Sequence, residues 1–196
     1  TFTDSGSGIS SKAPVVLNSD GTVSGISSAT GSVGSSTQMN SVYYLANSNG
    51  RNAVYDTSND KVVVFYTDYN GTPSRLGYAV VGTVSSGSIS FGTPVVVASA
   101  VGMWDFGVAF DSTANKVIIT YRDATNTEFR SQVGTVSGTS ISFGSAQQIG
   151  SINYSSEVDC IYDATADRVV TMVCDSGNGA VFVGQVSGTS ITWGSA

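Results

Sequence analysis

The chain has 196 residues, with 8 basic and 14 acidic side chains, a net charge of −6 and no histidine. The lack of histidine excludes Ser-His-Asp catalysis, histidine metal ligands and a histidine pH switch. The acidic balance, with basic residues scattered singly, argues against a nucleic-acid partner.

Valine occurs 27 times and leucine only three times. β-Branched side chains favour strands, whereas a helical protein is expected to be rich in leucine and alanine. We therefore expect an all-β protein without substantial helix. No apolar run reaches the length of about 18 residues that indicates a membrane span, so none is expected. Because the chain begins with Thr1, we expect a processed product or a part of something longer.

Two sequence segments recur along the chain. The first reads GTVSSGSISFG at Gly82–Gly92, GTVSGTSISFG at Gly134–Gly144 and GQVSGTSITWG at Gly184–Gly194. The second is an aromatic residue and an aspartate, followed after four residues by Lys/Arg-Val, and it begins at Tyr55, Phe110 and Tyr162. Both segments keep a spacing of about 50 residues, which indicates a repeat architecture.

The repeat divides the chain into a leading strand or stub and three units. The stub covers residues 1–13, and the units cover residues 14–93, 94–145 and 146–196. The first unit is longer because of a Ser- and Gly-rich insertion at about residues 20–40, for which we expect an exposed loop. Both ends of the chain stop at the same phase of the repeat, which suits continuation from one chain into another.

Each unit is predicted to contain four strands. In the middle unit these are residues 94–98, 106–110, 116–121 and 127–136, and a hairpin then turns the chain back. The run at residues 117–121 is largely apolar and does not alternate, as is typical of a strand covered on both faces. The predicted fold class is therefore all-β, a β-propeller-like array of three four-stranded repeats. Closed propellers have roughly four to eight blades, and three units are too few to close such a ring. Either two chains complete a ring, or further repeats belong to a longer chain, or the three units form an open stack.

Two sets of aspartates recur at the ends of predicted strands. The first set is Asp56, Asp111 and Asp163, and the second is Asp68, Asp123 and Asp175. Turn residues follow each aspartate, so we expect the carboxylates to accept hydrogen bonds from turn amides. A calcium site at Asp68 and Asn70 is the alternative, because these side chains supply oxygen ligands. That segment lacks further carboxylates, and neither a metal nor a cofactor is predicted.

The two cysteines, Cys160 and Cys174, lie on neighbouring strands of one predicted hairpin. If Tyr162 lies opposite Val169, then Cys160 lies opposite Thr171 and Cys174 points to the other face of the sheet. Two buried free thiols are favoured by this register. A disulfide is the alternative, although the geometry does not favour it.

Aromatic residues recur at one position of the repeat. Phe91, Phe143 and Trp193 are equivalent, and we expect them to pack between the units.

Trp104 departs from the repeat, because its equivalent in the third unit is Ser156. Its neighbours in the corresponding links of the second and third units are Asp105, Tyr154, Glu157 and Asp159. If these links share one rim, aromatic rings and carboxylates form a carbohydrate-binding surface. We take Trp104, Asp105, Tyr154 and Glu157 as the candidate ligand site. A tryptophan partly buried in an interface is the alternative.

These segments resemble repeats of the tail-fibre and appendage proteins of tailed phages. The resemblance rests on VGTVSGTSISFG at Val133–Gly144, on TPVVV at Thr93–Val97 and on the aromatic-Asp…Lys-Val segments Tyr55–Asp68 and Phe110–Asp123. The third unit departs from the pattern at Met172–Cys174. The resemblance covers about 150 residues and implies a propeller-like, non-catalytic module on a virion or another extracellular surface.

We therefore expect a structural or adhesive module that acts by oligomeric assembly and surface attachment, either as a homo-oligomer or beside further repeats. A lectin that binds cell-surface glycans is the alternative. A glycan-degrading enzyme is less favoured: it would need a pair of carboxylates, drawn from Glu128, Glu157 and the aspartates. The arginines fall at different phases of the repeat and predict no sialidase-like cluster.

Overall fold

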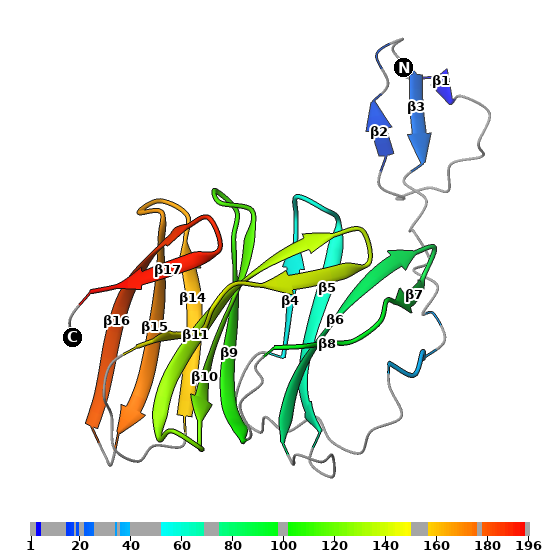
Figure 1. The fold of residues 1–196 in the computed structure, drawn as a ribbon. Helices are drawn as coiled ribbons and strands as arrows, with labels where there is room; N and C mark the ends of the chain where they lie inside the picture. Colours follow the sequence, from blue (N-terminus) through cyan, green and yellow to red (C-terminus); the bar gives the residue numbers. More distant parts are fainter. Residues whose placement is uncertain are drawn as a thin grey trace. The chain divides into compact units, whose positions relative to one another are not determined.

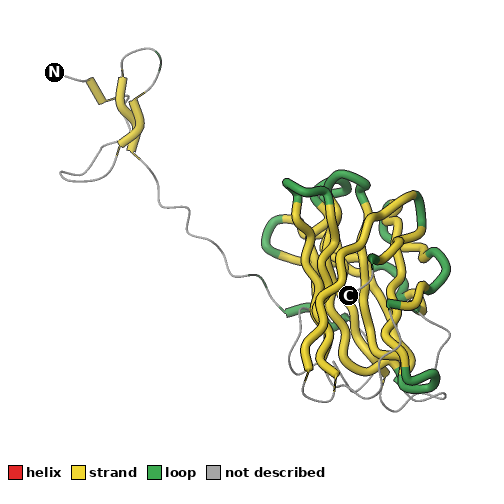
Figure 2. The backbone as a smooth tube through the Cα atoms, turned by 90° about the vertical axis from the view of Figure 1, so that its left-hand side faces the viewer, coloured by secondary structure: helices red, strands yellow, loops and turns green. Residues whose placement is uncertain are grey.

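The computed structural model describes residues 3–4, 15–17, 19, 22–25, 34, 36–39, 52–68, 75–97, 102–149, 157–175 and 178–194. The chain divides into two compact units, Thr1–Gly34 and Ser35–Ala196, which are treated separately. The described residues form strands and turns and contain no helix (Figure 2), which confirms the all-β prediction. Within this part of the chain, no helix has the length and apolar character needed to span a membrane.

The first unit contains a small three-stranded sheet of β1 (Thr3–Asp4), β2 (Val15–Leu17) and β3 (Thr22–Gly25). β3 is the central strand and pairs antiparallel with β2 and parallel with β1. The insertion at about residues 20–40 was predicted to be a loop, but its residues 22–25 form β3. Its β-branched Thr22 and Val23 fit a strand better than the Ser- and Gly-rich composition around them suggests.

The second unit contains three antiparallel sheets that follow one another along the chain (Figure 1). The strand order in each sheet is the order in the chain. The first sheet consists of β4 (Ala53–Asp56), β5 (Lys61–Asp68), β6 (Leu76–Ser85) and β7 (Ser88–Phe91). The second consists of β9 (Met103–Asp111), β10 (Lys116–Asp123), β11 (Glu128–Ser137) and β12 (Ser140–Phe143). The third consists of β14 (Glu157–Asp163), β15 (Arg168–Asp175), β16 (Asn178–Ser187) and β17 (Ser190–Trp193).

The described residues 94–97 do not form the first strand of the second sheet, so the prediction of a strand at residues 94–98 was wrong. β8 (Val95–Val96) pairs instead with β6 of the first sheet. β13 (Gln147–Gln148) pairs in the same way with β11 of the second sheet. The outer strand of each of these two sheets is therefore made of two pieces. They are β7 and β8 in the first sheet, and β12 and β13 in the second. In the first sheet the pieces are separated by Gly92–Pro94, where the proline has no N–H to donate to a ladder.

The three sheets stack face to face, and the second lies between the other two (Figure 1). Val63 and Phe65 of the first sheet are in one buried cluster with Val136 and Ile141 of the second. Residues 117–119 of β10 are fully buried, because β10 is the middle strand of a sheet covered on both sides. The prediction from the apolar run is confirmed.

The repeated aromatic residues pack between sheets, as predicted for Phe143 and Trp193. The Phe143 ring meets the Phe65 ring of the first sheet edge-on, with centroids 6.3 Å apart. The Trp193 indole Nε1 donates a hydrogen bond of 2.9 Å to the Ser131 hydroxyl of the second sheet. Each ring lies over a glycine of the neighbouring strand. A Cβ at Gly134 would approach Phe143 to 2.9 Å.

The first set of repeated aspartates holds the turns after β4, β9 and β14, which confirms the prediction. The Asp111 carboxylate accepts hydrogen bonds from the Thr113 and Ala114 amides at 2.9 and 2.8 Å. Asp56 and Asp163 make the equivalent pairs of bonds. Each turn ends in a residue with positive φ, at Asp60, Asn115 and Asp167.

The register predicted for the cysteine hairpin is also confirmed. Tyr162 lies opposite Val169, and Cys160 lies opposite Thr171. Cys160 is buried, Cys174 is partly exposed, and neither forms a disulfide.

Candidate functional site

A β-bulge places the predicted site residues Trp104 and Asp105. β9 and β10 are in regular register up to the pair Tyr121 and Phe106, and the next pair is Asp123 and Met103. Two residues of β9, Trp104 and Asp105, therefore lie opposite the single residue Arg122. A bulge of this kind turns side chains away from the regular alternation of the strand, and here it places Trp104 and Asp105 opposite Arg122.

Two guanidinium groups lie against the Trp104 ring. The Arg75 guanidinium carbon is 3.3 Å from the ring centroid, and that of Arg122 is 5.7 Å away. Both distances are within the range of cation–π attraction. Trp104 nevertheless keeps 38% of its surface exposed, so part of the indole remains available to a ligand.

Backbone contacts fix Arg75 beside β9. Arg75 adopts a positive φ of 61°, and its amide donates a hydrogen bond of 2.6 Å to the Asp68 carbonyl. Its own carbonyl accepts a bond of 3.0 Å from the Met103 amide. The turn between β5 and β6 of the first sheet is thereby tied to the first strand of the second sheet.

Asp105 interacts with the charged groups around it. Burial raises the pKa of the Asp105 carboxyl, and the Glu157 carboxylate raises it further. Arg122 and Arg75 act in the opposite direction and lower the same pKa. The predicted residues Trp104, Asp105 and Glu157 thus belong to one group of interacting side chains. Tyr154, the fourth predicted member, lies outside the described residues.

Arg75 and Arg122 were not predicted as members of this group, because the repeat offered no cluster of arginines. For Arg122 the sequence did hold a signal. Its equivalents in the first and third sheets are Thr67 and Cys174, so a large cation appears at a position that is small elsewhere. For Arg75 we find no such signal. Its approach to Trp104 depends on a turn conformation and on contact between two sheets.

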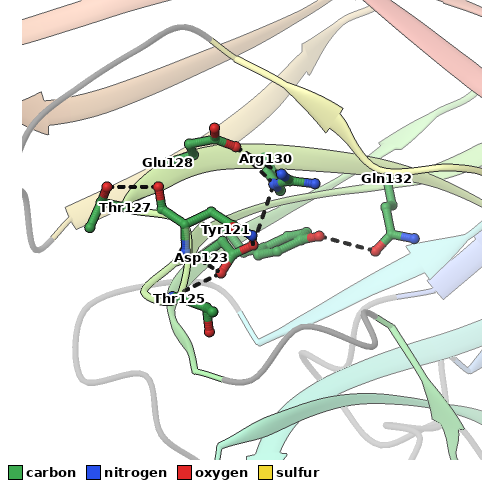
Figure 3. A network of polar contacts seen from close by, with 8 residues as sticks. Tyr121, Asp123, Thr125, Thr127, Glu128, Arg130 and Gln132 are labelled. Carbon is green, nitrogen blue, oxygen red and sulfur yellow. Dashed lines mark hydrogen bonds and ion pairs between the residues drawn. The ribbon is translucent and has the colours of Figure 1, made fainter.

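A second polar network holds the turn between β10 and β11 (Figure 3). The Asp123 carboxylate is buried and accepts amide hydrogen bonds from Thr125 at 3.0 Å and Asn126 at 3.3 Å. Arg130 lies 3.3 Å from the same carboxylate and also pairs with Glu128 at 2.9 Å. Asp123 therefore holds its turn as predicted, and its oxygens are already occupied.

The described residues contain no group of three or more acidic or cysteine side chains placed to hold a metal ion. The calcium alternative at Asp68 and Asn70 falls on a segment whose residues 69–74 are outside the described part of the chain.

The geometry defines what the Trp104 group can bind. An exposed indole surrounded by two guanidinium groups and two carboxylates offers both hydrogen-bond donors and acceptors. Such a combination suits a hydroxyl-bearing or mixed-charge ligand, while Arg75 leaves only part of the ring for stacking.

No protein-family model matches the chain, and neither curated proteins nor solved structures show a significant similarity to it.

Proposed function

We propose that this chain is a non-catalytic structural and adhesive module of a phage or another extracellular appendage, built as a β-propeller-like array. The observation that carries the proposal is that one sheet-to-sheet interface is built twice with equivalent residues. Phe143 packs on the first sheet as Trp193 packs on the second. A chain that repeats its own interface is suited to assembly.

The approach of the first strands supports a propeller-like arrangement. β9 packs against β14 and also contacts β4. At Gly107 of β9 the backbones are so close that a Cβ would lie 2.5 Å from the Asp159 Cα. Close packing of the first strands supports blades arranged around a common axis, as in propellers.

The use of the carboxylates supports a non-catalytic role. Asp56, Asp111, Asp123 and Asp163 bind the amides of their own turns. A glycosidase needs two carboxyl groups facing a common substrate. These four carboxylates are thus committed to structure.

Composition and resemblance support an extracellular place for the module. Only 11% of the residues are charged, which leaves a surface of hydroxyl and amide groups. The repeated segments resemble those of tail-fibre proteins, which lie on the outer surface of the virion.

Localisation tests this proposal directly. Antibodies raised against the chain, followed by immunogold electron microscopy of the producing cells and of any particles they release, are expected to label external fibres or appendages. Labelling confined to the cell interior would contradict the proposed function.

Glycan binding at Trp104 is a second candidate, favoured by the exposed indole beside two carboxylates and two guanidinium groups. Labelled protein is expected to bind a subset of glycans on an array, and Trp104→Ala is expected to abolish that binding. The matched control is Tyr55→Ala, which removes an exposed ring from β4. Binding that survives Trp104→Ala, or no binding at all, would remove this candidate.

A further inference from the structure

The same face of each sheet is covered in the first two sheets and open in the third. We define this docking face by register-equivalent positions on the two middle strands. In the first sheet they are Val63, Phe65, Ala79 and Val81, and in the second they are Ile118, Thr120, Ser131 and Val133. All eight are at most 1% exposed. In the third sheet they are Val170, Met172, Val181 and Val183, of which the last three are 56%, 53% and 47% exposed.

The opposite face, which we define as the wedge face, shows the reverse pattern. Its positions in the second sheet are Val136, Ile141 and Phe143, and in the third they are Val186, Ile191 and Trp193. In the first sheet they are Val84, Ile89 and Phe91. Val136 and Val186 are both 7% exposed, whereas Val84 is 57% exposed. The first sheet thus exposes Val84 at the outer end of its wedge face, whereas Tyr66 and Val80 on the same face are 2% and 0% exposed. The third sheet presents a docking face.

We propose that a second copy of this chain seats the wedge face of its first sheet on the docking face of the third sheet. This inference rests on the proposed function, since it specifies how an assembly module would assemble. The occupant is identified by the chemistry of the two faces.

Each wedge ring matches the residue beneath it. Trp193 has an N–H to donate, and it meets the Ser131 hydroxyl. Phe143 has no donor, and in the first sheet the position equivalent to Ser131 is the apolar Ala79. In the third sheet this position is Val181, opposite Met172. An apolar site of this kind fits a ring without a donor, and the thioether of methionine packs well against aromatic rings. The free wedge ring of the chain, Phe91, is such a ring.

The hairpin tips give a second match. The carbonyl of Thr139, in the turn between β11 and β12, lies so close to Gly92 of the first sheet that no Cβ fits there. Thr189 lies in the same way against Gly144 of the second sheet. At Gly194, the equivalent position in the third sheet, a Cβ would meet only the Val183 carbonyl at 3.6 Å. Gly194 therefore leaves space for the turn between β6 and β7 of a second copy.

The first strands of the sheets, β4, β9 and β14, indicate which of the two internal interfaces the proposed interface between copies resembles. Gly107 allows β9 and β14 to approach closely, but its equivalent in the third sheet is Asp159. The first sheet has Asn52 there, whose carbonyl accepts a hydrogen bond of 2.8 Å from the Phe65 amide. We therefore expect the copy to seat as the second sheet seats on the first, with a polar side chain at the inner strand and a phenylalanine wedge.

The proposed contact is head-to-tail, because it joins different faces of the two copies. Each chain has one face of each kind, so association either closes into a ring or continues as a filament. The net charge of −6 on each copy opposes association, and salt screens this repulsion. Association is therefore expected to strengthen in moderate salt.

Sedimentation velocity of single-face variants tests the proposal. Val181→Lys places a charge on the docking face and Val84→Lys places one on the wedge face. Both residues are exposed in the single chain, so folding should be preserved. Wild-type protein is expected to sediment as an assembly larger than the 20.0 kDa chain. Each variant alone is expected to remain monomeric, and an equimolar mixture is expected to form a one-to-one dimer through the two intact faces. The control Thr165→Lys adds the same charge to an exposed turn of the third sheet and should assemble like the wild type.

Three results would overturn the proposal: a monomeric wild type, a Val84→Lys variant that still associates, or a mixture that stays monomeric. The second result would indicate association through two like docking faces. Failure here is separate from failure of the proposed function. A chain that is monomeric but is labelled on external appendages keeps the function and loses this interface.

Discussion

At the scale of single residues, buried carboxylates hold the turns between neighbouring strands. Asp111 is 1% exposed and binds two turn amides, whereas the equivalent Asp163 makes the same bonds at an exposed position. We expect Asp111→Ala to lower the free energy of unfolding by about 1–3 kcal/mol, because two partly buried hydrogen bonds to a carboxylate are lost. Asp163→Ala should cost less, since water can replace the lost carboxylate. Urea unfolding of the two variants measures the difference, and equal losses would contradict this explanation.

Asp105 gives the Trp104 group a pH dependence. Burial raises the pKa of its carboxyl, so the protonated form is favoured in the folded state. The stability from this residue is present below the ordinary aspartate pKa and is lost as pH rises through the raised folded pKa. We expect Asp105→Asn to increase stability at neutral pH by less than about 1 kcal/mol, because solvent screens a partly exposed group, and to have little effect in acid. Urea unfolding of the wild type and of Asp105→Asn, at neutral pH and in acid below the ordinary aspartate pKa, checks this. An equal change in the free energy of unfolding under the two conditions would refute it.

At the scale of strands, glycines make room for the wedge rings. A Cβ at Gly134 would lie 2.7 Å from the Ile141 Cδ1 and 2.9 Å from the Phe143 Cε1. We expect Gly134→Ala to lower the free energy of unfolding by about 1–3 kcal/mol by displacing both side chains. Gly179→Ala is the matched control, since its Cβ meets nothing within 4 Å. Thermal unfolding of both variants should show a loss of stability only for Gly134→Ala.

The strands and turns were largely predictable because the same sequence pattern recurs in each unit. Alternation and the anchor at Tyr162 fixed the register that places Cys160 opposite Thr171. The pairing of β8 was not predictable, because a run of two paired valines carries no information about which neighbour it joins. The Trp104 group was predictable only in part. Trp104 and Arg122 break the repeat visibly, but their meeting with Arg75 requires a bulge and a turn with positive φ.

At the scale of the whole molecule, the hydrogen bond from Trp193 to Ser131 is one of those that link the third sheet to the second. Trp193→Phe would remove the donor and leave the buried Ser131 hydroxyl without this partner, at a cost of about 1–3 kcal/mol. Adding Ser131→Ala should recover much of that loss, because the pair then resembles Phe143 over Ala79 at the other internal interface. A double-mutant cycle in urea measures the coupling. Additive losses would show that the two internal interfaces are not equivalent.

The interrupted outer strands affect how copies of this chain can meet. A long free sheet edge is a template for another strand and leads to amyloid-like growth. In the first two sheets the outermost strand is short and is broken after Phe91 and Phe143, so an incoming strand finds no continuous ladder. We therefore expect the interrupted edges of these two sheets to disfavour fibrillar aggregation, while the proposed contact between copies uses sheet faces instead of edges.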